Sequence, residues 1–287
     1  MTDELPSDLD QLIDTALLQL DNDIDDPDSP ASLRAVAELH KRTDAATLAA
    51  AVELCKSADD KRKRLGAIIL GQLGYSNNVF REERYAALEG LLLAEMATAA
   101  SPEVLNDVCV ALGHLIDRRA VPIVLKLIGH PSAEVRFGVV AALSCHEDEA
   151  AIAGLIRLST DDDDDVRDWA TFGLGQLIDA DTAAIRAVLH ARLEDANVDV
   201  RSEAIGGLAR RQDKTILPVL VRELNERVAS PLLEAARDLA DPSLCAALLK
   251  SRKIISEAEE DEDRLASSWR TLWLEAMAAC GCRLDDT

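Results

Sequence analysis

The residues that could do chemistry in this sequence are few and scattered. Five histidines occur among 287 residues, and only one of them, His146, stands next to a glutamate, Glu147. The sequence has no Gly-x-Ser-x-Gly elbow, no P-loop, no dinucleotide-binding fingerprint and no His-Glu-x-x-His motif. We therefore predict no catalytic residues, no metal and no cofactor, and we interpret His146 as a loop residue. Catalytic residues gathered from several parts of the chain would leave no local signature, so an enzyme stays the alternative.

The six cysteines favour free thiols. Cys55, Cys109, Cys145 and Cys245 lie within apolar helical patterns, and no Cys-x-x-Cys pair occurs. We expect buried thiols in a reducing compartment rather than disulfides or zinc. The segment 280–282, Cys-Gly-Cys, has too few ligands for a zinc site by itself. Its thiols are either reactive or merely exposed.

Acidic residues dominate the charge. The formal net charge is −22, and the first 33 residues contain ten acids and no Lys or Arg. Such a potential repels phosphate backbones and anionic lipids, so we predict neither a nucleic-acid nor a membrane partner. The runs at 21–25, 161–165 and 257–263 are interpreted as solvated surface or charge at helix starts rather than as calcium sites. With no signal peptide and no long apolar run, a cytoplasmic location is expected.

An internal repeat supplies the elements that would position any site. Three segments begin with an acid, Val and Arg and reach a Leu eight residues after the Val, and their Val residues are Val135, Val166 and Val200. The spacings of 31 and 34 residues accommodate two short helices and two turns. Apolar residues at the Val and at positions +4, +7 and +8 after it form the stripe of a helix with one buried face.

The repeat predicts an all-α protein made of helix pairs. Each aligned segment is the second helix of a pair, and N-cap chemistry precedes it at Ser132, at 161–165 and at Asp195. First helices are predicted at 45–57, 82–99, 118–129, 148–159, 182–193, 214–225 and 242–250. We expect about six to seven pairs in a right-handed α-α superhelix over 31–250, an acidic arm over 1–30, and an acidic segment with a capping helix over 251–287.

These segments resemble HEAT-like repeats of the phycobilin-lyase class, whose units carry acid-Val-Arg-x-x-Ala-x-x-x-Leu. The resemblance covers roughly residues 31–250 and implies that the repeated acids and arginines link successive units. It also implies a wide range of functions: scaffolds, adaptors, pigment lyases, an iron hydroxylase and DNA-repair glycosylases. The single His146-Glu147 pair argues against a di-iron hydroxylase, and the negative charge argues against a glycosylase.

In resembling solenoids the second helices line the concave surface, and side chains at +2, +3, +6 and +10 from the repeat Val face the groove. This register selects the candidate partner-binding residues Asn106, Asp107, His114, Phe137, Trp169, Phe172, Gln176, Glu203 and Arg210. The three aromatic residues among them either anchor a partner or pack between repeats. The leading hypothesis is a non-catalytic scaffold that binds a protein or peptide in the groove. The alternative is an enzyme or ligand-handling protein resembling pigment lyases, with a cysteine or carboxylate as the reactive group.

Overall fold

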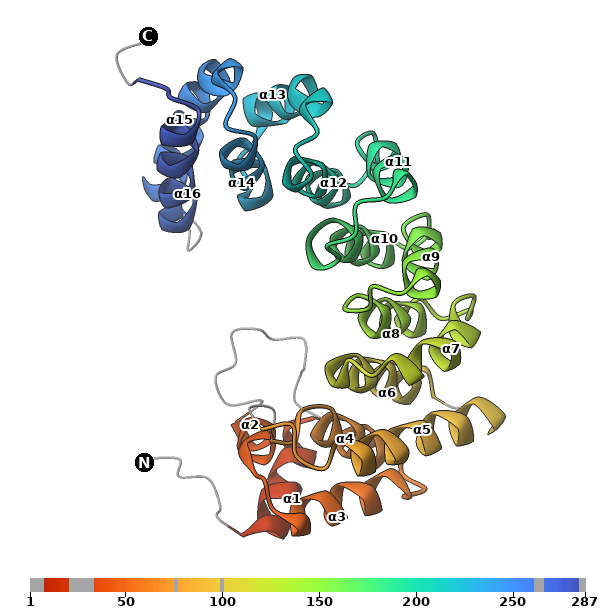
Figure 1. The fold of residues 1–287 in the computed structure, drawn as a ribbon. Helices are drawn as coiled ribbons and strands as arrows, with labels where there is room; N and C mark the ends of the chain where they lie inside the picture. Colours follow the sequence, from red (N-terminus) through yellow and green to blue (C-terminus); the bar gives the residue numbers. More distant parts are fainter. Residues whose placement is uncertain (1–7, 21–33, 75–76, 99–100, 261–265, 284–287) are drawn as a thin grey trace. The chain divides into compact units, whose positions relative to one another are not determined.

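The computed structural model describes residues 8–20, 34–74, 77–98, 101–260 and 266–283. Within these ranges the secondary structure is helical, with sixteen α-helices and no β-strand (Figure 1). The all-α prediction is therefore confirmed. The chain divides into two compact units, Met1–His146 and Glu147–Thr287.

The first unit contains four helix pairs. Its first helices are α1 (Leu9–Gln19), α3 (Ala45–Cys55), α5 (Arg81–Thr98) and α7 (Val121–Val124), the last of which is flanked by 3-10 turns at Arg118–Ala120 and Leu125–Leu127. Its second helices are α2 (Arg34–Lys41), α4 (Asp60–Gln72), α6 (Pro102–Leu115) and α8 (Ala133–Leu143). The second helices pack side by side, α2 on α4, α4 on α6 and α6 on α8, so they form one layer of the unit.

The second unit repeats this arrangement. Its first helices are α9 (Glu149–Leu158), α11 (Ala183–Arg192), α13 (Leu217–Glu226) and α15 (Cys245–Glu260). Its second helices are α10 (Asp164–Phe172), α12 (Val198–Arg210), α14 (Ser230–Leu239) and α16 (Ala266–Ala279), and each packs on the next (Figure 1). The helix pairs predicted from the repeat are thus confirmed as a HEAT-like solenoid. The structure has four pairs in each unit, because α1 with α2 and α15 with α16 pack as the other pairs do.

Side-chain capping starts two of the second helices of this unit, α10 and α12. The Asp163 carboxylate accepts a hydrogen bond from the backbone N–H of Val166 at 3.1 Å, as the acidic run at 161–165 predicts. In the next repeat the cap is Asn197, which accepts from Asp199 N, so the prediction of Asp195 as the N-cap is wrong. Asp195 instead accepts hydrogen bonds from Arg167 of the preceding repeat.

The repeated arginines connect the repeats. In each of the three aligned segments, the Arg Nη1 donates to carbonyl oxygens five and six residues earlier, in the turn before its own helix. These carbonyls belong to His130 and Pro131 for Arg136, to Asp161 and Asp162 for Arg167, and to Asp195 and Ala196 for Arg201. Arg167 and Arg201 also reach Asp195 and Glu223 of the following repeat, whereas the acids of the signature, Asp165 and Asp199, are exposed. The arginines therefore make the links that the resemblance implied, and the linking carboxylates are not those of the signature.

Small residues let successive second helices approach closely. The second helix of the α9–α10 pair continues as a π-helical turn at Gly173–Leu177, and a Cβ on Gly207 of α12 would lie 2.6 Å from Gly175 Cα. In the first unit, a Cβ on Gly71 would lie 3.0 Å from Ala111 Cα. Glycine is required at these positions because backbone, rather than a flexible side chain, occupies the space.

Arginines also close the ends of two second helices. Arg211 donates to the carbonyl oxygens of Leu174 and Gly175, and Arg84 donates to those of the equivalent Leu70 and Gly71. Helix-end carbonyls have no partner within the helix, so these buried guanidinium groups satisfy them.

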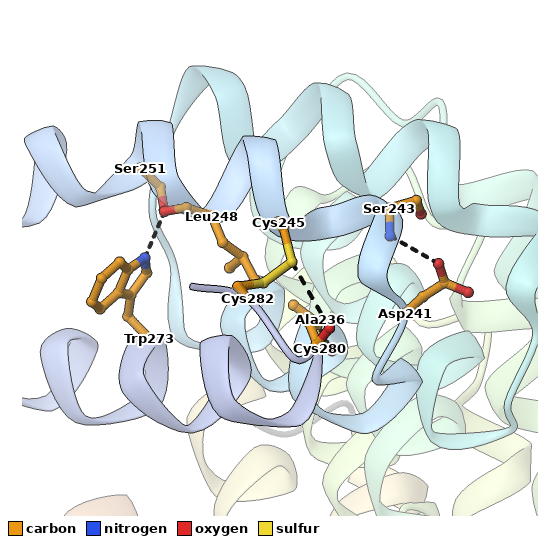
Figure 2. The surroundings of a disulfide bond; sticks show 9 residues. All are labelled: Ala236, Asp241, Ser243, Cys245, Leu248, Ser251, Trp273, Cys280 and Cys282. Carbon is orange, nitrogen blue, oxygen red and sulfur yellow. Dashed lines mark hydrogen bonds between the residues drawn. A yellow bond between two sulfur atoms is a disulfide. The ribbon is translucent and has the colours of Figure 1, made fainter. Parts of the chain in front are cut away.

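The prediction that all cysteines are free thiols is wrong. Cys245, the first residue of α15, forms a disulfide with Cys282, just after the end of α16 (Figure 2). The two helices pack together, and the structure brings the start of the first near the end of the second. A separation of 37 residues with no motif hid this pairing from the sequence. The acidic run at 21–25 lies outside the described residues, as does part of the run at 257–263.

Candidate functional site

The nine residues predicted to face a partner fall into two groups, one on each unit. Asn106, Asp107, His114 and Phe137 lie on α6 and α8 of the first unit, and Trp169, Phe172, Gln176, Glu203 and Arg210 lie on α10, its π-helical continuation and α12 of the second. Each group is described within its own unit.

In the first unit, the polar candidates are paired. Arg64 Nε of α4 donates to Asp107 Oδ2 at 2.7 Å, and Asn106 Nδ2 donates to Asp107 Oδ1 at 3.3 Å. Burial raises the pKa of Asp107, and the bond with Arg64 opposes this rise. Gln72 Nε2 donates to His114 Nε2 at 3.1 Å. These contacts tie α4 to α6 and leave Asp107 neutralised within the chain.

Asn106 of α6 also lies at the contact with α8, the helix that carries Phe137. Gly138 of α8 lies against Asn106, since a Cβ on Gly138 would be 3.0 Å from Asn106 Cα. Asn106 Oδ1 is buried and accepts no hydrogen bond from a described residue. Phe137 is half-buried beside this contact.

In the second unit, an aromatic pair lies on α10. The rings of Trp169 and Phe172 are 5.5 Å apart in an edge-to-face arrangement. Trp169 is 48% exposed, whereas Phe172 is half-buried. About half of the Trp169 side chain therefore faces solvent, and the two interpretations left open by the sequence both stay predictions.

Four carboxylates on three successive second helices influence one another electrostatically, and one of them, Asp168, precedes Trp169 in the chain. We call Asp168 of α10, Asp199 and Glu203 of α12 and Glu234 of α14 the acidic face. Asp168 Oδ1 and Glu203 Oε2 are buried, and neither accepts a hydrogen bond from a described residue. A buried carboxylate oxygen without a donor is costly, because the protein does not replace the water that it loses.

The electrostatics follow from this crowding. Burial, with the charges of Asp199 and Asp165, raises the pKa of Asp168 to about 6. Burial, with the charges of Asp168, Glu234 and Asp199, raises the pKa of Glu203 to about 7, although a hydrogen bond from Gln176 opposes the rise. At pH 7 the Glu203 carboxyl is therefore about half protonated, and a nearby cation would favour its charged form.

Gln176 and Arg210 have structural roles beside the acidic face. A Cβ on Gly206 would collide with Gln176 Nε2, so the glycine makes room for the amide that bonds Glu203. Arg210 Nη1 donates to the Gln176 carbonyl oxygen at 2.6 Å, and its other nitrogen pairs with Asp179. Arg210 thus connects α12 to the preceding repeat rather than neutralising the acidic face.

Sequence reasoning missed three members of the acidic face: Asp168, Asp199 and Glu234. The register itself contained the signal for two of them, because Asp168 is at +2 in its repeat, and Glu234 is at +3 when the repeat is extended by 31 residues to α14. Asp199 precedes the repeat Val and was interpreted only as a linking acid.

A cavity of about 420 Å³ opens in the first unit, and none of the nine candidates lines it. Val52, Leu91 and Ala94 are among its lining residues, from α3 and α5, and the ion pair between Lys63 and Glu95 lies at its wall. Its lining is mainly aliphatic and lacks histidine. No group of three or more His, Cys, Asp or Glu residues that could hold a metal occurs in the described ranges. Among those ranges, no helix is both long and apolar enough to cross a membrane.

Comparison with known proteins identifies related chains. A family model described as HEAT repeats matches residues 90–175. Protein YibA of Escherichia coli strain K12 is 31% identical over 228 residues, which make up 77% of this chain and 79% of YibA.

Two solved structures are also similar to this chain. The crystal structure of Escherichia coli YibA matches with a TM-score of 0.59 and 25% identity, over 95% of this chain and 99% of that one. The crystal structure of an engineered protein matches with a TM-score of 0.50 and 17% identity, over 93% of this chain and 77% of the other, which is a likeness of fold alone.

Proposed function

We propose that this chain, which belongs to the family of HEAT-repeat proteins that includes YibA of Escherichia coli, is a non-catalytic scaffold that binds a basic segment of a protein partner. The partner segment lies on the second-helix face of the second unit. Its Lys or Arg side chains pair with the acidic face, and an apolar or cationic side chain contacts Trp169.

The unsatisfied carboxylates carry this proposal. Asp168 Oδ1 and Glu203 Oε2 are buried without a donor among the described residues, while Asp199 and Glu234 add negative charge nearby. A folded chain loses stability by holding acids in this way, so the arrangement is explained if a ligand supplies the missing donors. Lys and Arg supply several donors together with the opposite charge.

The aromatic pair adds an anchor. Trp169 is half exposed, and Phe172 supports its ring at the edge. Exposed Trp is enriched among residues that dominate binding energy, and its face also attracts cations. An acidic patch beside such a ring fits a basic peptide better than it fits nucleic acid or an anionic membrane, which the net charge of −22 repels. A cytoplasmic location is part of the same proposal.

A direct binding measurement tests it. The probe is a fluorescein-labelled peptide of alternating Lys and Ala, and its anisotropy is followed at about 0.15 M salt. The double variant Asp168→Asn/Glu203→Gln should bind at least about ten-fold more weakly than the wild type, a loss of about 1.4 kcal/mol. Trp169→Ala should cost about 2 kcal/mol of binding with little loss of thermal stability, because its side chain is exposed.

The matched control carries the same change of net charge on the other layer. Glu149→Gln/Glu226→Gln removes two exposed acids from α9 and α13, and should leave peptide affinity within about two-fold of the wild type. Equal weakening by both double variants would mean that only the net charge attracts the peptide, and would refute the assigned face. A peptide of alternating Glu and Ala should not bind.

A ligand-handling activity is the second candidate, and the raised pKa values favour it. Carboxyl groups with a pKa near 6 and near 7, such as those of Asp168 and Glu203, are suited to donate and accept protons at neutral pH. The resemblance to phycobilin lyases makes an open-chain tetrapyrrole the probe. A change in its absorbance with the wild type that is lost in Glu203→Gln, without any binding of the Lys-Ala peptide, would favour this function over the scaffold.

A further inference from the structure

Three cysteines gather at the last helix pair of the second unit. Cys245 begins α15, and its disulfide partner Cys282 follows α16 by three residues (Figure 2). Cys280 lies between them in the chain, with its Sγ 3.4 Å from the carbonyl oxygen of Ala236 of α14. The disulfide therefore joins the start of α15 to the segment that follows α16.

The disulfide is not what holds the body of α16. Trp273, Ala276 and Met277 are buried, and Trp273 Nε1 donates to the carbonyl oxygen of Leu248 at 2.6 Å. An exposed ion pair at 3.2 Å connects Glu275 to Arg237 of α14. Because these contacts persist without the bond, its loss should loosen the end of the pair without unfolding the unit.

This disulfide is more accessible than the buried thiols of Cys55 and Cys109. Cys55 and Cys109 are buried thiols, and burial raises the pKa of each to about 12, so both are poor nucleophiles. Cys245 and Cys282 are each half-buried, and Gly281 beside them is exposed. A small thiolate in solution can therefore approach the sulfur of Cys282.

We infer that the Cys245–Cys282 disulfide is a reversible redox clasp on the terminal helix pair. The thiolate of a small thiol such as glutathione attacks Cys282 Sγ, the S–S bond breaks, and Cys245 leaves as a thiolate that takes a proton from water. A second thiolate attacks the mixed disulfide, which releases Cys282 and forms the oxidised thiol. Oxidised glutathione drives the same two exchanges in reverse.

The clasp controls the end of the solenoid. Each repeat contacts only its neighbours, and among the described residues α15 and α16 pack on the preceding pair, α13 and α14. In the oxidised state the bond holds the chain after α16 at the start of α15. In the reduced state the segment after α16 is released, and α16 opens more often.

The full chain, equilibrated in oxidised or reduced glutathione, tests this inference. Native alkylation with iodoacetamide followed by mass spectrometry should label the exposed Cys145 and Cys282 in the reduced buffer. In the oxidised buffer Cys282 should stay unlabelled in its disulfide with Cys245, and Cys145 should be recovered as its mixed disulfide with glutathione. Hydrogen exchange of the α16 amides should be at least about ten-fold faster after reduction, whereas the α12 amides should keep their rates.

Two variants serve as controls. Cys145→Ser removes an exposed thiol outside the clasp and should keep the redox response. Cys245→Ser/Cys282→Ser should match the reduced wild type in both buffers, with unchanged α12 exchange as proof of folding. Labelling of Cys282 in oxidised glutathione, survival of the bond in reduced glutathione, or equal α16 exchange in the two states would each overturn the clasp.

Discussion

Replacing Arg211 by Ala should destabilise the second unit more than replacing its exposed neighbour, Arg210, by Ala. Arg211 has a 5% exposed side chain. Its Nη1 donates to the carbonyl oxygens of Gly175 and Gly207 at 3.0 Å, and its Nη2 donates to three further carbonyls at 2.8–3.0 Å. These three belong to Leu174, Ile178 and Ala180. One guanidinium group thus closes the end of the π-helical turn.

The magnitude follows from what remains after the side chain is removed. A hydrogen bond to a charged group contributes about 1.5–3 kcal/mol, but five such bonds from one group do not add, and water would enter the space that the side chain leaves. Burial lowers the pKa of Arg211, which shows that desolvation of its charge offsets part of the gain. We expect Arg211→Ala to cost about 3 kcal/mol and to lower the melting temperature by about 6–10 °C.

Thermal melting followed by circular dichroism measures this effect. Arg210→Ala is the matched control, because it removes the same side chain one residue away, where the ion pair with Asp179 is exposed. It should lower the melting temperature by no more than about 2 °C. Arg211→Lys should recover less than half of the loss, since an ammonium cannot reach five carbonyls. Equal melting of Arg211→Ala and Arg210→Ala would refute the capping role.

Three further outcomes follow from the same structure, each read by thermal melting. Arg167→Ala removes the contact with Asp195 of the next repeat and should cost about 2–3 kcal/mol of stability. Arg157→Ala removes an exposed side chain and should cost less than about 0.5 kcal/mol. Equal melting temperatures of the two variants would place Arg167 in solvent. Gly207→Ala forces the backbones at Gly207 and Gly175 apart and should cost about 1–3 kcal/mol of stability. Gly90→Ala, with open space around it, should stabilise its helix by about 0.5–1 kcal/mol. Stabilisation by both changes would contradict the close approach of Gly207 to Gly175. Glu203→Gln should raise the free energy of unfolding at pH 8 by about 1–2 kcal/mol and leave it unchanged at pH 5. A carboxyl whose folded pKa is raised to about 7 destabilises the fold as pH rises from about 5 through 7. A difference that does not depend on pH would contradict the raised pKa.

Much of the fold could be predicted because its signals are local. The apolar stripe after Val166 and Val200 has helical spacing, and the structure places helices at Asp164–Phe172 and Val198–Arg210. The first helix predicted at 182–193 is observed at Ala183–Arg192, since Thr182 caps it. The helix predicted at 118–129 is instead a series of short turns around Val121–Val124.

What the sequence missed depends on contacts between distant residues. The Arg210-Arg211 dipeptide has one type of side chain twice, yet Arg210 is exposed and Arg211 is buried. Arg211 donates to five carbonyl oxygens, whereas Arg210 donates to one and pairs with the exposed Asp179. The Cys245–Cys282 bond depends in the same way on where α16 ends beside α15. Neither arrangement has a local pattern that could reveal it.

The repeat register predicted on which helices the candidates lie but not what surrounds them. It placed Trp169 and Glu203 on second helices, where the structure has them, because side chains on one helix face recur with the repeat. It could not show that Glu203 Oε2 is buried without a donor, or that Asp168 is close enough to raise its pKa. These properties arise only when α10 and α12 are packed together.

The two units treat the same register position in opposite ways, and this contrast supports the proposed function. Position +3 holds Asp107 in the first unit and Glu203 in the second. Arg64 of the preceding repeat neutralises Asp107 at 2.7 Å. Glu203 receives only the neutral amide of Gln176 and faces further acids. Since the fold can supply an arginine to a buried carboxylate at this position, the lack of one at Glu203 among the described residues is not forced by the architecture. A basic side chain of a partner would occupy there the place that Arg64 takes in the first unit, and would bring the same charge compensation.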